Sequence, residues 1–178
     1  IRYDSSNPNL HKYRGDLHLA QGHKLKALYD YDKIVWIKGD KATSYDYLRV
    51  AQLEEERGNY DNAIICYSKI LRGDDLNDGA YLSRAKAYTK KGDIYNAIAD
   101  YNSVIRLNPY QSSVYKERGI LLVQIKSYRR GVDDLDKALR LEPENGLLYY
   151  YRAIANKALG RTEQAKFDYE KAKKYEML

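Results

Sequence analysis

Small residues recur along this chain at a nearly constant interval. One series consists of Gly15, Ala51, Ala85, Gly119 and Ala153, with spacings of 36, 34, 34 and 34 residues. A second series follows twelve residues behind the first: Ala27, Ala63, Ala97, Gly131 and Ala165. A sustained period of this length is the signature of a repeat array, in which each repeat is one supersecondary unit. The period therefore constrains the fold more tightly than the composition does.

Two further series show what each unit contains. A turn series lies between the small residues: Gly22, Gly58, Gly92, Lys126 and Gly160. A bulky series follows it: Tyr31, Tyr67, Tyr101, Leu135 and Tyr169. Glycine ends one helix and turns the chain, and the small residues on either side let two antiparallel helices approach closely. Such a pair cannot bury its own apolar face, so the copies stack. We expect an all-α solenoid of five helix-turn-helix units.

The third unit carries the most specific motif. It reads Ala80-Tyr81-x-x-Arg84-Ala85-x-Ala87-Tyr88, then Gly92-Asp93-Ile94-Tyr95-x-Ala97-Ile98-x-x-Tyr101, and ends with Leu107-Asn108-Pro109. This pattern resembles the tetratricopeptide repeat (TPR). The resemblance implies a right-handed superhelix and a single domain over 8–178. Its units lie at about 8–43, 44–77, 78–111, 112–145 and 146–178, after an N-terminal extension over 1–7 that can be flexible. The chain departs from the family pattern where Lys126 replaces the turn glycine and Gly131 replaces alanine, and the first two units lack the closing proline.

The repeats also predict contacts within each unit. Four first helices carry an arginine with an aspartate sixteen residues later: Arg14 with Asp30, Arg84 with Asp100, Arg118 with Asp134, and Arg152 with Asp168. In the second unit Val50 and Cys66 take these places. We interpret the pairs as structural ion pairs, partly buried Arg–carboxylate forks that join the two helices. Loss of one partner should then cost about 3–5 kcal/mol. The same comparison makes Cys66 a packing residue.

The chain offers no constellation that supports catalysis. It contains no Gly-rich phosphate loop, and its one cysteine has no partner for zinc binding or thiol catalysis. By repeat phase, His11 and His18 face the helix packing, while His23 follows a turn glycine and should be solvated. The carboxylate run Glu54 to Glu56 points in different directions along its helix. We therefore expect no enzymatic activity, no cofactor and no metal site.

Charge and hydropathy bear on two other classes of partner. The net charge is +6, but acidic residues such as Glu54 interrupt it, whereas a nucleic-acid groove needs a continuous basic face. Most of the tyrosines suited to base stacking occupy repeat-core positions, so nucleic acid is disfavoured as a partner. No run of about 18 apolar residues is present to span a membrane. The sequence does not determine the compartment.

The first helices of the units should line the concave face of the solenoid, which the resemblance implies holds a peptide or helix of another protein. The family's clamp for acidic chaperone tails maps to Lys12, Asp16, Arg49, Gly79 and Ser83, and only Lys12 agrees with it. The predicted groove residues are instead Arg49, Lys86, Ile120, Val123, Leu147, Tyr150, Tyr151 and Ile154. Alternatives are packing of the apolar C-terminal surface on further helices, self-association through exposed end helices, and RNA binding.

Overall fold

A computed structural model describes residues 6–175 of the chain, so most of the predicted N-terminal extension (residues 1–5) lies outside the described residues. The regular structure of residues 6–175 is entirely helical. The first helices are α1 (Pro8–Ala20), α2 (Lys24–Lys38), η1 (Gly39–Lys41), α3 (Ser44–Glu56), α4 (Tyr60–Gly73) and α5 (Asp78–Lys91). The remaining helices are α6 (Ile94–Leu107), α7 (Ser112–Gln124), α8 (Tyr128–Leu139), α9 (Gly146–Ala158) and α10 (Thr162–Lys174). The predicted fold class, an all-α solenoid of helix-turn-helix units, is confirmed.

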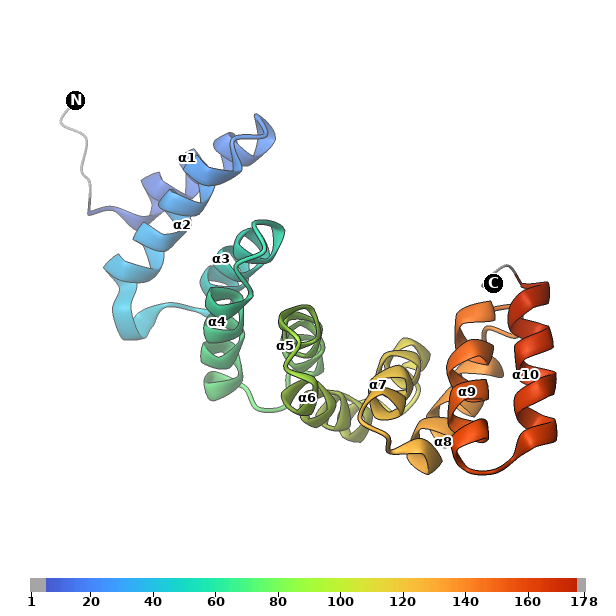
Figure 1. The fold of residues 1–178 in the computed structure, drawn as a ribbon. Helices are drawn as coiled ribbons and strands as arrows, with labels where there is room; N and C mark the ends of the chain where they lie inside the picture. The colour runs from blue at the N-terminus through green and yellow to red at the C-terminus, as the bar shows by residue number, and fades with distance from the viewer. Residues whose placement is uncertain (1–5, 176–178) are drawn as a thin grey trace. The chain divides into compact units, whose positions relative to one another are not determined.

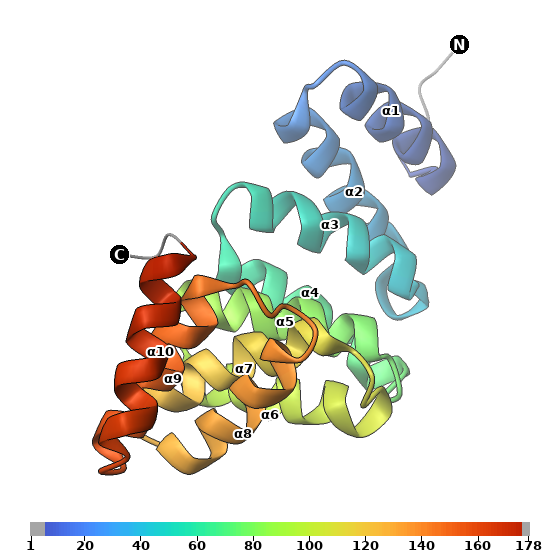
Figure 2. The same ribbon diagram turned by 90° about the vertical axis from the view of Figure 1, so that its right-hand side faces the viewer.

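The helices form two compact parts, residues 1–92 and residues 93–178. In the first part, α1 packs on α2, and α3 packs on α4 (Figure 1). In the second part, α7 packs on α8, and α9 runs beside α10 (Figure 2). The boundary falls inside the third repeat unit, because α5 belongs to the first part and α6 to the second. The extent of a single domain over 8–178 stays a prediction.

The turn between the two helices of a unit requires left-handed backbone. Gly92 has φ 84° and ends α5, and the other glycines of the turn series also have positive φ. Lys126 stands in the same place in the fourth unit with φ 62°, the one non-glycine residue among those described with positive φ. A side chain in this region costs roughly 1–2 kcal/mol. The repeat geometry therefore persists where the glycine is missing.

The longer spacing between the first two units has a local cause. After α2 the chain forms the short 3₁₀ helix η1 before α3 begins. Thr43 caps α3 in a capping box with Asp46, and Lys38 Nζ donates to Asp46 Oδ2 at 2.8 Å. Asp46 therefore accepts a hydrogen bond in the N-terminal cap of α3 and also binds Lys38 at the end of α2.

Each part has its own apolar core, built from the small and bulky series. Tyr31 and Tyr67 are fully buried in the first part, and Tyr101 and Leu135 in the second. In the fourth unit, a Cβ added to Gly131 would lie only 2.8 Å from Val123 Cγ2. Val123 thus fills the space that alanine occupies in the other units, which accounts for the departure from the repeat pattern.

Candidate functional site

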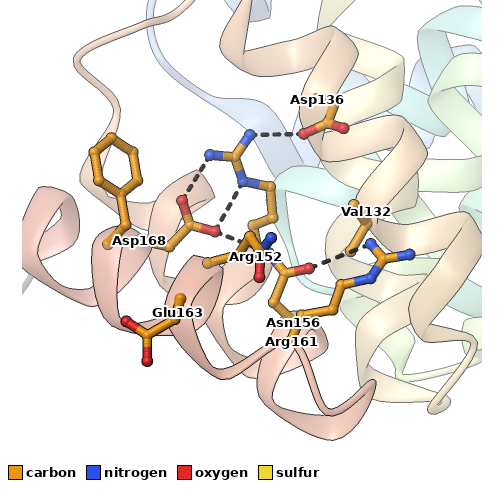
Figure 3. Close-up of a pocket in the computed structure, with 9 residues that line it drawn as sticks. Val132, Asp136, Arg152, Asn156, Arg161, Glu163 and Asp168 are labelled. Carbon is orange, nitrogen blue, oxygen red and sulfur yellow. Dashed lines mark hydrogen bonds and ion pairs between the residues drawn. The ribbon is translucent and has the colours of Figure 1, made fainter.

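Arg152 on α9 joins three helices of the second part (Figure 3). Its Nε and Nη2 donate to the two carboxylate oxygens of Asp168 on α10, at 3.0 and 2.6 Å. Its Nη1 donates to Asp136 on α8 at 2.6 Å. The Asp168 side chain is 2% exposed and also accepts from Asn156 Nδ2 at 3.0 Å. The fork therefore links the helices within the fifth unit, and the third nitrogen links that unit to the one before it.

Arg118 repeats this geometry, and Arg84 repeats the contact to the preceding unit. Arg118 donates to Asp134 at 2.7 and 2.8 Å, and its Nη1 donates to Asn102 on α6 at 2.6 Å. In the first part, Arg84 Nη1 donates to Ser68 Oγ on α4 at 2.9 Å. In each case the acceptor in the preceding unit lies sixteen residues before the arginine in the sequence. The repeat pattern alone did not predict this contact. The predicted pairing of Arg84 with Asp100 stays a prediction.

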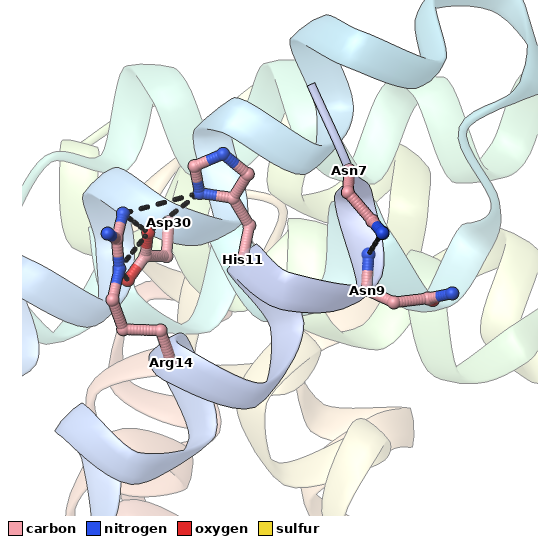
Figure 4. Close-up of polar contacts among 5 residues, drawn as sticks. All are labelled: Asn7, Asn9, His11, Arg14 and Asp30. Carbon is pink, nitrogen blue, oxygen red and sulfur yellow. Dashed lines mark hydrogen bonds and ion pairs between the residues drawn. The ribbon is translucent and has the colours of Figure 1, made fainter. Parts of the chain in front are cut away.

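In the first unit the fork includes a histidine (Figure 4). Arg14 Nε donates to both oxygens of Asp30, at 3.0 and 2.9 Å, and His11 Nδ1 lies 2.9 Å from Asp30 Oδ1. Burial acts to raise the pKa of Asp30, but the hydrogen bonds from Arg14 and His11 outweigh it and lower that pKa below its ordinary value. His11 is buried, as its repeat phase predicts, and here it supports the fork.

The second unit replaces the fork by apolar packing. Val50 and Cys66 are both buried. Burial raises the pKa of the Cys66 thiol to about 11, and the negative charges of Asp32 and Glu54 raise it further. A thiol with this pKa is a poor nucleophile at neutral pH. Cys66 therefore serves packing, in line with the sequence analysis.

A hollow of about 460 Å³ opens in the first part between α3 and α5. Tyr45, Leu48 and Ser83 line it on these first helices, and Ile70 of α4 lines it as well. Arg49 Nε donates to the Tyr45 hydroxyl at 3.2 Å. The ring of Tyr45 also lies 5.4 Å from the Arg49 guanidinium and 5.1 Å from Lys12 Nζ. The hollow is thus apolar inside, with two cations beside the ring at its edge.

The predicted polar groove residues of the first part differ in their surroundings. Arg49 is half-buried beside Tyr45, whereas Lys86 is exposed on α5. Sequence analysis selected Arg49 but missed Tyr45 and Leu48. The signal was present, because the corresponding positions in the fifth unit are Leu147 and Tyr150, which the same analysis did select.

The predicted apolar groove residues of the second part lie on α7 and α9. Ile120, Tyr151 and Ile154 are half-buried and pack against the core of this part. Leu147 is also half-buried, and the half-buried Tyr150 ring contacts Tyr151 and Tyr169, with centroids 5.7 and 6.3 Å apart. Four of these five half-buried residues therefore lie on α9.

Val123 differs from the other residues selected for this surface. It is 4% exposed and belongs to the core, where it fills the space beside Gly131. A partner cannot reach its side chain without a rearrangement of α7 and α8. Val123 therefore supports this surface from the core and does not contact a partner directly.

Within residues 6–175, no three His, Cys, Asp or Glu side chains are grouped so that they could hold a metal ion. None of the helices in that range combines the length and the apolar character needed to cross a bilayer. Glu54, the buried member of the acidic run, is bound by Arg57 and Asn62 at 3.0 Å each. These contacts give it a structural role.

Comparisons with known proteins point to one family. Residues 78–111 match the sequence model of a family described as tetratricopeptide repeat. No curated protein matches the chain. Among solved structures, a crystal structure of MamA is 18% identical, with a TM-score of 0.82, over 95% of this chain and 91% of that one. MamA 41-end from Desulfovibrio magneticus is 16% identical, with a TM-score of 0.80, over 99% and 97% of the chains. YrrB, described as a TPR protein with an unusual peptide-binding site, is 15% identical, with a TM-score of 0.83, over 99% and 90%.

The fold defines the chain as an all-α solenoid of helix-turn-helix repeats. Residues 78–111 match the tetratricopeptide-repeat family, and the chain shares its fold with solved structures such as MamA and YrrB, of which YrrB is described as a TPR protein.

Proposed function

We propose that this chain is a non-catalytic protein-interaction module or scaffold, which binds a peptide or helical segment of a partner along its first helices. The observation that carries the proposal is the apolar hollow between α3 and α5. Its volume of about 460 Å³ falls in the range of pockets that hold a large side chain and its neighbours. Most of its lining comes from α3 and α5, first helices that the repeat pattern assigns to the concave face.

The hollow favours a particular kind of segment. Tyr45 and Leu48 supply apolar contact, and tyrosine is enriched among binding hot spots. Arg49 and Lys12 place positive charge at the Tyr45 ring. A segment with one large apolar side chain and a nearby carboxylate would fit this arrangement, and the exposed Lys86 would contact a longer segment.

The half-buried surface of α7 and α9 is the second element of the proposal. Ile120, Tyr150 and Ile154 would anchor a partner there, with Leu147 and Tyr151 beside them. Exposed or half-exposed aromatic surface of this kind commonly marks a binding site. YrrB, a TPR protein with an unusual peptide-binding site, supports this class of function for the fold, and does not bear on these particular residues.

A variant comparison tests the proposal. Leu48→Glu places a charge in the first hollow, and Ile120→Glu/Ile154→Glu places charges on the second surface; Ile65→Glu, on an exposed residue of α4, is the control. After a check for equal helicity and melting temperature, each protein is used to capture partners from nuclease-treated lysate. Partners retained by the control and lost by a groove variant support that groove. Equal capture by all variants would contradict the assignment of the site.

Self-assembly through the end helices is the alternative. It predicts that molecular mass in solution rises with protein concentration, which sedimentation measures directly. RNA binding predicts instead a steep loss of captured material as salt increases and complete loss after nuclease treatment.

A further inference from the structure

The outer face of α1 presents positions that the other units bury. Leu10 is 40% exposed and Leu17 is 56% exposed. Their equivalents in the later first helices are at most 6% exposed: Asp46, Ala80, Val114 and Leu148 for Leu10, and Leu53, Ala87, Leu121 and Ala155 for Leu17. Tyr13, between the two leucines, is 73% exposed. The positions that are buried on the first helices of the later units are therefore exposed to solvent on α1.

The C-terminal part shows what covers this side of a first helix. Leu148 and Ala155 of α9 belong to one apolar cluster with Val132, Leu135 and Leu139 of α8. The covering element is thus the second helix of the preceding unit. It supplies apolar residues at relative positions i, i+3 and i+7 on one helix face.

The arginine at the centre of each contact shows the same difference. The side chains of Arg118 and Arg152 are 14% and 19% exposed, but that of Arg14 is 38% exposed. Arg118 and Arg152 are covered by the preceding helix, which also supplies their acceptors Asn102 and Asp136. The Arg14 side chain is thus the most exposed of the three.

Two hollows lie at equivalent places in the fifth and the first unit, around Arg152 and Arg14. The hollow around Arg152 has a volume of about 440 Å³ and is walled on one side by Val132 and Asp136 of α8 (Figure 3). The hollow around Arg14 has a volume of about 350 Å³, and its lining comes from α1 and α2 alone. It contains Arg14 and Lys26, together with the buried Asp30. A helix laid against α1 would close this second hollow as α8 closes the first.

We propose that the outer face of α1 is a docking surface for one amphipathic helix of a partner protein, which adds to the stack as the second helix of a preceding unit does. The chain's own second helices define the chemistry of this ligand. It has aliphatic residues at i and i+7, tyrosine or leucine at i+3, and a short polar residue at i+4. The i+4 residue is aspartate or asparagine in three of the four covering helices. In α2, α4, α6 and α8 in turn, the four positions i, i+3, i+4 and i+7 are Leu28, Tyr31, Asp32 and Val35; Ile64, Tyr67, Ser68 and Leu71; Ile98, Tyr101, Asn102 and Ile105; and Val132, Leu135, Asp136 and Leu139.

Charge favours the acidic version of this ligand. Arg14 and Lys26 place exposed or partly exposed positive charge at the hollow between α1 and α2. Asp30 is fully buried, and Asp16 accepts a hydrogen bond from the Tyr31 hydroxyl. An aspartate at i+4 would therefore meet a positive surface, as Asp136 meets Arg152.

A second copy of this chain is a poorer occupant. In α10 the positions that cover a following unit are Lys166 and Lys173, both exposed, so head-to-tail stacking would bring lysines against Leu10 and Leu17. In a symmetric α1–α1 contact, the three exposed side chains would contribute on the order of 350 Å² per copy, against about 800 Å² in a standard interface.

The test uses a helical peptide with the sequence of residues 127–141, which carries Val132, Leu135, Asp136 and Leu139. Gly131→Ala and a lactam bridge on the solvent face hold the helix in this probe. Fluorescence anisotropy of the labelled peptide reports its binding to the full chain. We expect saturable binding that weakens at least tenfold for Leu10→Glu/Leu17→Glu, because two apolar contacts are lost. The control Ile65→Glu/Leu76→Glu changes residues that are similarly exposed and should leave the affinity unchanged.

A peptide variant makes the test independent of protein folding. Val132→Glu/Leu139→Glu in the peptide should also abolish binding, and the surface variant Ile120→Glu/Ile154→Glu of the protein should not affect it. This last comparison separates the α1 surface from the surfaces proposed above. Absence of binding up to millimolar peptide, or equal binding by the wild type and Leu10→Glu/Leu17→Glu, would overturn the proposal. A wild type that sediments as a dimer while Leu10→Glu/Leu17→Glu sediments as a monomer would also overturn it, in favour of a second copy.

Discussion

The fork between Arg118 and Asp134 gives the sharpest test of how the units are held together. Arg118→Val removes a guanidinium that makes two charge-assisted hydrogen bonds to Asp134, at 2.7 and 2.8 Å. The Asp134 side chain is 4% exposed, so its carboxylate would be left buried without this partner. Removal of one partner of a buried pair costs about 3–5 kcal/mol. In a chain of this length that corresponds to a fall in melting temperature of roughly 6–20 °C.

The second unit supplies the matched control. Val50 and Cys66 occupy the equivalent positions there and are both buried. The double variant Arg118→Val/Asp134→Cys recreates this apolar pair, and should lie within about 1–2 kcal/mol of the wild type because a well-packed apolar pair can replace an ion pair. Asp134→Cys alone should cost about 1–3 kcal/mol, since Arg118 then keeps its bond to Asn102.

Urea unfolding followed by circular dichroism at 222 nm, under reducing conditions, measures all four proteins. The double-mutant cycle should give a coupling free energy of at least about 2 kcal/mol. A loss of less than 1 kcal/mol for Arg118→Val would show that the pair behaves as an ordinary surface pair. Additive single effects would show that the two residues stabilise the chain independently.

Three further predictions concern local features. Lys126→Gly should raise the free energy of unfolding by about 0.5–1 kcal/mol in chemical denaturation, because it relieves the left-handed strain at φ 62°; a loss of stability would contradict this. Gly131→Ala should cost about 1–3 kcal/mol through the contact with Val123, and should be neutral or stabilising in a Val123→Ala background; an equal cost in both backgrounds would exclude that contact as the cause. Burial, followed by the charge of Glu54, raises the pKa of Asp32 in the folded state, so the contribution of Asp32 to stability is present at low pH and is lost as pH rises through that pKa. Asp32→Asn should therefore raise the melting temperature at pH 7 by about 1–2 °C and leave it unchanged at pH 3; a gain of equal size at both pH values would refute the electrostatic cause.

The sequence predicted the repeat architecture because the period is a property of spacing alone. The small residues recur where the two helices of a unit touch, and the turn glycines recur where the backbone is left-handed. Both therefore appear as a regular spacing in the sequence. The spacing of sixteen residues between arginine and aspartate is visible in the sequence for the same reason. The link sixteen residues in the other direction escaped notice because its acceptors vary in type, as Ser68, Asn102 and Asp136 show.

Exposure was harder to predict, because it depends on what neighbours are present. Val123 looked like groove surface, since the run from Ile120 to Val123 is apolar on every side of its helix. Its burial follows from the missing side chain at Gly131, a residue on a different helix. The exposure of Leu10 and Leu17 was detectable in principle, by a comparison of their phases with the buried positions of the later units. That comparison requires knowledge of which side of a first helix meets the preceding unit, and the structure supplies it.

The placement of the arginines has a consequence for how the C-terminal part opens. Helix α8 carries Asp134, which holds Arg118 of α7, and also Asp136, which holds Arg152 of α9. Loss of α8 alone would remove the Asp134 fork from Arg118 and the Asp136 contact from Arg152, and so break contacts on both of its sides at once. Local fluctuations should therefore be confined to the ends of this segment, and the amides of α8 should exchange with solvent only in openings that also involve α7 and α9. In a stack where each unit touches mainly its neighbours, the two aspartates of α8 couple α7, α8 and α9 into one cooperative segment.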